Sequence, residues 1–135
     1  MASASFSQLA TSRVTLTDAA TTLFKFDLAS NTGAGGIIFW SLFATDGTDH
    51  QRLTGISTFS AVSKAGTVTA TVVNDTDNDA KAASGGSTIT TTWTIAGTGG
   101  VVTVTVEPTG SLTETTYYID YAAIMFNPEN YPVLA

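Results

Sequence analysis

Residues 87–95 read STITTTWTI, and this segment decides the fold class. Every second position carries Ile89, Thr91, Trp93 and Ile95, and threonine fills the positions between them. Successive side chains of a β-strand point to opposite faces, whereas a helix brings residues three or four apart onto one face. The spacing therefore predicts a strand with one buried face and one wet face.

Similar alternation, or a short apolar run bounded by turn residues, recurs along the rest of the chain. The β-branched and aromatic side chains that fill these segments are typical of strands. The expected strands are residues 13–17, 23–28, 37–44, 50–62, 67–73, 87–95, 101–107 and 115–126. Eight short strands joined by tight turns, with no convincing helix, predict an all-β domain built as an antiparallel β-sandwich or jelly roll.

Three local features refine this prediction. The apolar run 37–44 is expected to be a central, well-buried strand, and the Asp46-Gly47 pair that follows it favours a hairpin turn. Gly55 is a candidate β-bulge within the return strand. Residues 74–86 are polar and acidic, which predicts a loop.

The ends of the chain differ in composition from the domain between them. Residues 1–12 are rich in Ala and Ser and are expected to form an N-terminal arm, with the β-sandwich spanning residues 13–126. Residues 127–135 contain two prolines, which favour an extended C-terminal tail. Tyr131, Val133 and Leu134 give this tail apolar anchors, which dock either on its own sheet or on a neighbouring subunit.

Composition excludes several classes of function. The 135-residue chain has a net charge of −6, so phosphate backbones and anionic membranes are unfavourable partners. The chain has no cysteine, which removes disulfides, thiolate nucleophiles and Cys-containing zinc motifs. No window resembles a signal peptide or a membrane span, so a soluble protein is expected.

Catalytic candidates are few. The single histidine, His50, lies near Asp46 and Asp49, and Ser57 or Ser60 could be imagined as a nucleophile. No G-x-S-x-G elbow is present, and adjacent turn residues seldom supply the geometry of a triad. The expectation is a surface histidine, no catalytic residues and no enzymatic activity.

Acidic residues offer two further candidates. The D-x-D-x-D pattern of Asp75, Asp77 and Asp79 matches the first ligand positions of an EF-hand loop, but Ala80 replaces the turn glycine and no flanking helices are predicted. A solvated acidic loop is expected, and an opportunistic cation site is the alternative. The carboxylates that could in principle converge for glycosidase chemistry are Glu107, Glu114, Asp120 and Glu129.

Asp120 and the aromatic residues have two interpretations each. Asp120 lies between Ile119 and Tyr121, so it is either an outward-facing side chain or a buried carboxylate paired with Arg13 or Arg52. An aromatic platform for sugars could be built from Trp40, Trp93, Tyr117, Tyr118 and Tyr121. The two tryptophans lie in apolar registers and are expected in the core, and one of Tyr117 and Tyr118 is expected to be exposed.

Two segments resemble the small, Gly/Thr-rich β-domains of tailed bacteriophages. These segments are residues 44–51, ATDGTDHQ, and residues 59–69, FSAVSKAGTVT. The resemblance implies a structural protein of the virion, made in the host cytoplasm, without catalytic residues or cofactors. A capsid decoration (cement) protein that binds the major capsid protein, often as a homotrimer, is the first implication. A tail or fibre module that binds a receptor or carbohydrate is the second.

The residues expected at an interface follow from exposure and from the tail. They are Tyr117, Tyr118, Tyr131, Val133 and Leu134.

Overall fold

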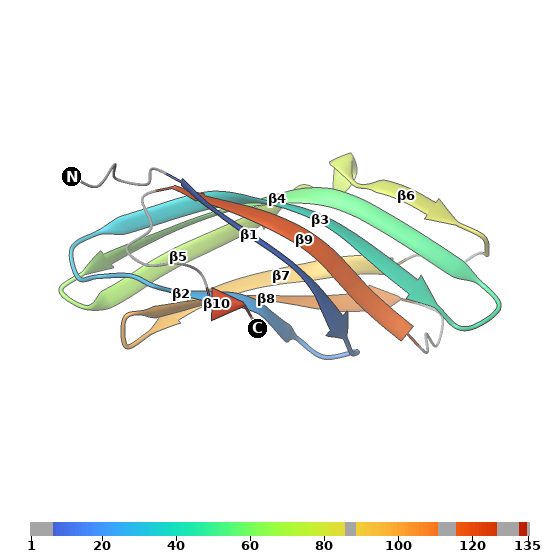
Figure 1. Cartoon of the computed structure of the whole chain (residues 1–135), viewed down its shortest axis with the longest axis horizontal. Helices are drawn as coiled ribbons and strands as arrows, with labels where there is room; N and C mark the ends of the chain where they lie inside the picture. The colour runs from blue at the N-terminus through green and yellow to red at the C-terminus, as the bar shows by residue number, and fades with distance from the viewer. Residues whose placement is uncertain (1–6, 86–88, 111–115, 127–132, 135) are drawn as a thin grey trace.

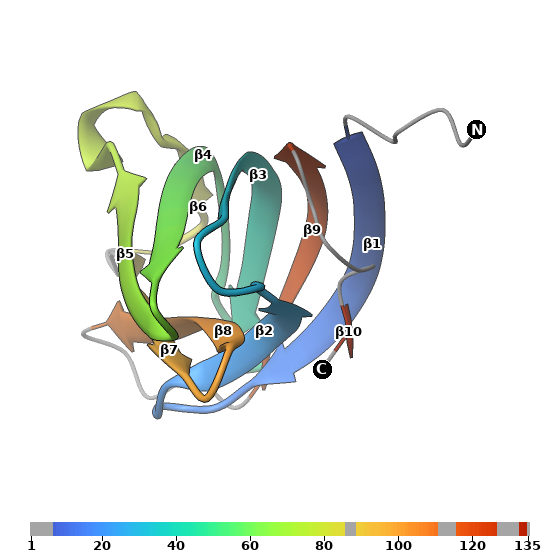
Figure 2. The same cartoon turned by 90° about the vertical axis from the view of Figure 1, so that its left-hand side faces the viewer.

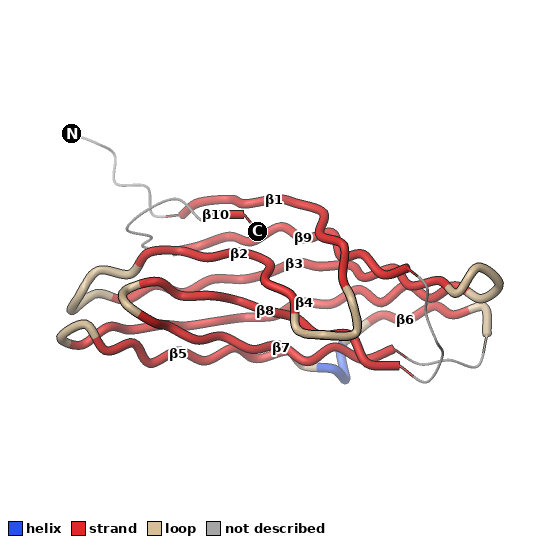
Figure 3. The backbone as a smooth tube through the Cα atoms, turned by 90° about the horizontal axis from the view of Figure 1, so that it is seen from below, coloured by secondary structure: helices blue, strands red, loops and turns tan. Residues whose placement is uncertain are grey.

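The structure, a computed structural model, describes residues 7–85, 89–110, 116–126 and 133–134. Within these residues ten strands form two antiparallel sheets stacked face to face (Figure 1). The predicted antiparallel β-sandwich is therefore confirmed. The helical element of the described part is the short 3-10 turn η1 (Thr76–Asn78), drawn in blue in Figure 3, and no helix there is long and apolar enough to cross a membrane.

The larger sheet has six strands. Their order is β1 (Ser7–Leu16), β9 (Thr116–Phe126), β3 (Gly33–Thr45), β4 (His50–Lys64) and β5 (Thr67–Asn74). The short strand β6 (Ala80–Ala83) pairs with β4 on the same edge as β5, at residues 51–54 of β4. The first strand, β1, pairs with β9, near the other end of the chain, along ten residue pairs.

The smaller sheet has the order β10 (Val133–Leu134), β2 (Thr21–Asp27), β8 (Val101–Gly110) and β7 (Ile89–Thr98). Figure 2 shows the six-stranded sheet curving over this second layer, and β5 packs against β7 to close one side of the sandwich. The backbone of β10 pairs with β2, so this part of the C-terminal tail docks on its own sheet.

The core fills the space between the sheets with the inward-facing side chains of both layers. Trp40 on β3 and Trp93 on β7 are 2% and 9% exposed, and their rings meet at 5.5 Å. Phe24 on β2 stacks on Tyr121 of β9 at 5.8 Å. The expectation that both tryptophans anchor the core is confirmed.

A β-bulge in β2 is tied to the opposite sheet by one hydrogen bond. The register shifts between Thr22 and Phe24, so Leu23 has no partner in the ladder and both Leu23 and Phe24 point into the core. The hydroxyl of Tyr121 donates to the backbone oxygen of Leu23 at 2.9 Å. This bond satisfies a buried carbonyl that the bulge frees from the sheet.

The structure differs from the sequence-based expectations at several elements. The strand β1 begins at Ser7, inside the segment expected to be an arm, because residues 7–12 continue the pairing with β9. Residues 74–86, expected as a loop, contain η1 and β6. The run 37–44 is buried on one face only: Phe39 is 42% exposed.

The expected bulge at Gly55 is wrong. Gly55 pairs with Trp40 in an unbroken register between β3 and β4. An added Cβ at Gly55 would lie 2.6 Å from Cζ2 of Trp40 and would also clash with Oδ1 of Asp79. The glycine is therefore explained by close packing against a large indole, which is the second common reason for glycine in a strand.

Candidate functional site

The outer face of the six-stranded sheet carries side chains in rows that run across the strands. One row, called the polar row, contains Arg13 on β1, Asp120 on β9, Ser41 on β3 and Thr54 on β4. A second row, called the aromatic row, lies two residues from the polar row along the strands and contains Tyr118, Phe43 and Arg52. A third, called the apolar row, lies two residues from the polar row in the opposite direction and contains Ala122, Phe39 and Ile56. Neighbouring rows are about 7 Å apart because each strand residue adds about 3.3 Å.

Ion pairs and hydroxyl contacts hold the polar row together. Arg13 donates from Nε and Nη2 to the two carboxylate oxygens of Asp120, at 2.6 and 2.9 Å. Nε of Arg52 donates to the hydroxyl of Ser41 at 2.8 Å, and the hydroxyls of Ser41 and Thr54 meet at 2.7 Å. The hydrogen bond from Arg13 lowers the pKa of Asp120 below its usual range. The carboxylate is therefore charged at neutral pH.

The aromatic row forms a line of ring contacts with its neighbours. The rings of Phe43 and Tyr118 meet at 5.3 Å, and His50 stacks on the other side of Phe43 at 6.1 Å. The guanidinium carbon of Arg13 lies 4.1 Å from the centre of the Tyr118 ring, and that of Arg52 lies 5.7 Å from it. Both arginines of the chain thus contact one tyrosine, by cation–π geometry.

The rest of this face mixes exposed large apolar side chains with polar ones such as Thr58, Ser60 and Thr71. The large apolar side chains that are exposed among the described residues all belong to this face: Phe39, Ile56, Val62, Val73 and Phe126. By contrast, the outer face of the four-stranded sheet presents Thr, Lys, Asp and Glu side chains from β2, β7 and β8. Because these exposed apolar side chains gather on one face, that face is favoured over the other as a contact surface.

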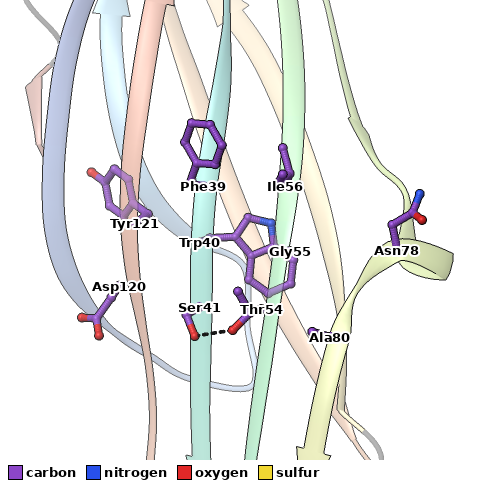
Figure 4. A pocket seen from close by; sticks show the side chains of 10 residues that line it. All are labelled: Phe39, Trp40, Ser41, Thr54, Gly55, Ile56, Asn78, Ala80, Asp120 and Tyr121. Carbon is purple, nitrogen blue, oxygen red and sulfur yellow. Dashed lines mark hydrogen bonds between the residues drawn. The ribbon is translucent and has the colours of Figure 1, made fainter.

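A shallow groove of about 580 Å³ lies where the polar and apolar rows meet. Figure 4 shows Phe39, Ser41, Thr54 and Ile56 side by side on β3 and β4, with Asn78 of η1 across from them. The segment between β5 and β6 bulges away from the edge of β4 and forms this far wall. The groove therefore combines an aromatic ring, two hydroxyls, the carboxylate of Asp120 and an amide.

A buried polar chain supports that wall. Nε1 of Trp40 donates to the hydroxyl of Ser57 at 3.1 Å, and Ser57 donates to Oδ1 of Asn74 at 2.9 Å. Nδ2 of Asn74 in turn lies 3.5 Å from Oδ2 of Asp79. In the described part of the chain, Oδ1 of Asp79 is buried without a hydrogen-bond partner, and burial raises the pKa of this carboxyl.

The structure leaves His50 near Asp46 but places Ser57, a candidate nucleophile, far from His50. His50 is exposed and its Nδ1 lies 2.7 Å from the hydroxyl of Thr45. Asp46 accepts from the backbone amides of Thr48 and Asp49, which lowers its pKa. Ser57 is buried seven residues along β4 from His50, a distance of about 23 Å in an extended strand.

The described carboxylates considered for glycosidase chemistry lie on different sheets, and those considered for a cation are held by local hydrogen bonds. Glu107 belongs to the four-stranded sheet and Asp120 to the other sheet, while Glu114 and Glu129 lie outside the described residues. Asp75 caps η1 by accepting from the amide of Asp77, and Asp79 turns toward Asn74. Among the described residues no three His, Asp or Glu side chains gather as metal ligands.

The expectations for Asp120 and the tyrosines have mixed outcomes. Asp120 faces outward, with its side chain 33% exposed, and it also pairs with both Arg13 and Arg52. Tyr117 is buried and Tyr118 is half-buried on the outer face, so Tyr118 can contribute to a surface and Tyr117 cannot. Val133 and Leu134 are paired with β2, and Tyr131 lies outside the described residues.

The sequence interpretation missed Phe39, Ser41, Thr54 and Ile56. Their partners in the rows come from strands far apart in the chain, and that register is visible only in the folded sheet. One signal was available in the sequence. The odd-numbered positions of residues 37–44 lie on one face of a strand and include Ser41, the one polar residue of this run, which indicates that this face is the outer one.

No protein-family model and no curated protein sequence matches the chain. The fold is similar to part of a phage tailspike. The crystal structure of the tailspike protein of Acinetobacter baumannii phage AM24 superposes with a TM-score of 0.54 at 8% sequence identity. The similarity covers 94% of this chain and 28% of the tailspike chain, so this chain spans about a quarter of the tailspike's length. At this identity the likeness shows a shared fold.

Proposed function

We propose that this chain is a structural protein of the virion of a tailed bacteriophage, which attaches to a partner through the outer face of its six-stranded sheet. The observation that carries the proposal is the concentration of exposed large apolar side chains on that face. Protein contact surfaces are enriched in such side chains and depleted of charge at their centre. The sequence resemblance to phage β-domains and the fold shared with a tailspike support the same class of protein. We also propose that the chain is not an enzyme.

Within the virion, we propose a position in the tail. The shared fold with a tailspike favours this position over the capsid decoration role, in which a homotrimer would bind the major capsid protein. The decoration role remains the alternative, because the exposed apolar side chains of this face suit a capsid protein as well as a tail protein as the partner.

Pelleting experiments separate these positions. The purified chain is mixed with purified phage tails and, separately, with expanded capsids, and light scattering gives its solution mass. We expect saturable binding to tails, lost in Ile56→Lys and retained in Thr92→Lys, which adds the same charge to the other sheet. Saturable binding to capsids alone would replace the tail position by the decoration role. Binding to neither particle would contradict the virion proposal.

A second candidate function is carbohydrate binding by the same tail module. The specific observation in its favour is the polar row flanked by aromatic rings along β3, together with the groove beside it. Binding to a glycan array, abolished by Phe39→Ala and by Tyr118→Ala, is the expected result. An array without hits would remove this candidate and leave the structural role in place.

A further inference from the structure

A second hollow continues the groove along β4 and β6. It has a volume of about 320 Å³ and is lined by Phe43, His50, Arg52, Ser84 and residues of β6. In the register of β4 with β6, Thr54 faces Ala80 and Arg52 faces Ala82. Both hollows therefore follow the same two strands. The small alanine side chains of β6 leave space above this edge.

The side chains along this path alternate between stacking and hydrogen-bonding groups. Phe39, Ser41 and Phe43 are successive outward positions on β3, so each is about 7 Å from the next. A sugar ring has apolar C–H faces and a rim of hydroxyl groups. Aromatic rings bind the former, and hydroxyl, amide and carboxylate groups bind the latter.

Arg52 shares the carboxylate of Asp120 with Arg13, so the two arginines together carry one more positive charge than this carboxylate neutralises. Arg13 already pairs with both oxygens of Asp120 at short distance. Arg52 is fixed through Nε, whereas Nη1 lies 3.4 Å from the hydroxyl of Tyr118 and Nη2 lies 3.5 Å from Asp120, both of them long contacts. Its side chain is 40% exposed. The planar end of a guanidinium group binds a carboxylate through two parallel hydrogen bonds.

We propose that the two hollows bind an acidic oligosaccharide and that Arg52 recognises its carboxylate group. The inference rests on the carbohydrate-binding candidate above and adds the charge of the ligand and the residue that selects it. The rings of Phe39 and Phe43 stack on sugar faces, while the polar row binds hydroxyl groups. Binding involves no covalent step.

Calorimetric titration of the full chain with an oligogalacturonate tests the proposal, with the same oligosaccharide after carboxyl reduction as the neutral probe. We expect the acidic probe to bind about tenfold more tightly than the neutral one. The variant Arg52→Gln is expected to lose this preference, and Arg52→Lys to keep part of it. Lys25→Gln, on the outer face of the four-stranded sheet, is the matched control and should keep it in full. Thermal unfolding checks that each variant is folded.

The outcomes separate this proposal from the candidate function on which it rests. Equal binding of both probes, with no effect of Arg52→Gln, would overturn the role of Arg52 and the preference for acid while carbohydrate binding stood. A preference for the acidic probe that Lys25→Gln and Arg52→Gln reduce equally would also overturn it, because general charge attraction would then be the cause. Binding of neither probe would overturn the inference, and the glycan array would show separately whether other carbohydrates bind.

Discussion

The turn between β4 and β5 places a non-glycine residue in the left-handed region. Ala65 has a φ of 50° and Gly66 a φ of 84°, and Lys64 pairs with Thr67 on either side. The equivalent turn between β7 and β8 has glycine at both positions, with φ of 58° and 80° at Gly99 and Gly100. Left-handed backbone costs an ordinary side chain about 1–2 kcal/mol, and asparagine tolerates it better.

Ala65→Asn should therefore stabilise the protein by about 0.5–1 kcal/mol, because Asn-Gly is the favoured pair in such hairpins. In the turn between β7 and β8, Gly99→Ala places an alanine in the left-handed region and should destabilise the protein by a similar amount. Urea unfolding measures both differences. Loss of stability in Ala65→Asn would show that the left-handed conformation of residue 65 is wrong.

Tyr121 is a second residue with an individual effect on stability, through its hydroxyl group. It is buried between the sheets, where burial raises the pKa of the phenol to about 12, and it stays protonated and donates to Leu23. Tyr121→Phe leaves the bulge carbonyl without a partner and should cost about 1–1.5 kcal/mol of unfolding free energy. Tyr118→Phe is the control, since that hydroxyl meets Nη1 of Arg52 only at 3.4 Å. Equal effects of the two changes would contradict the account of the bulge.

At the scale of elements, the segment that joins β5 to β6 contains a carboxylate in an unfavourable place. Burial raises the pKa of Asp79, so the folded protein holds this proton more tightly than the unfolded chain does. This group therefore makes stability fall as the pH rises from the unfolded pKa, about 3.9, through the raised folded pKa. Asp46 and Asp120, whose pKa values are lowered, act in the opposite direction at lower pH.

Asp79→Asn should remove this pH dependence. The difference in unfolding free energy between the variant and the wild type should shift in favour of the variant as the pH rises from 3.5 to 7. Asp77→Asn, in the same turn but exposed, controls for the loss of one negative charge. Chemical unfolding at several pH values measures the difference, and a constant difference for Asp79→Asn would contradict the burial of this carboxylate.

Elements with strict alternation were predictable from the sequence, and edge elements were not. The segments 89–95 and 24–28 follow the period of two. In the first, Ile89, Thr91 and Trp93 are buried as predicted and Ile95 is partly buried; in the second, Phe24, Phe26 and Leu28 are buried. The short β6 strand consists of Ala-Lys-Ala-Ala, which has little strand preference, and it forms because the edge of β4 offers free backbone groups. The start of β1 was missed for a similar reason, since pairing with β9 extends it.

At the scale of the molecule, the two outer faces could not be told apart from the sequence. Each strand shows which of its residues lie on the same face, but the rows depend on pairing between residues such as Arg13 and Asp120, which are 107 positions apart. The pairing of these two residues was one of two alternatives raised by the sequence. The groove was not predicted, because its wall and its floor come from segments that meet only in the folded sheet.

The central claim is that the outer face of the six-stranded sheet is buried against a partner in the assembled virion. The chain contains no cysteine, so single cysteines can report on each face. Thr58→Cys places a thiol in the apolar part of this face, and Thr92→Cys places one on the outer face of the other sheet. We expect maleimide labelling of assembled particles to be blocked at position 58 and to proceed at position 92, whereas free labelling at 58 with protection at 92 would contradict the claim.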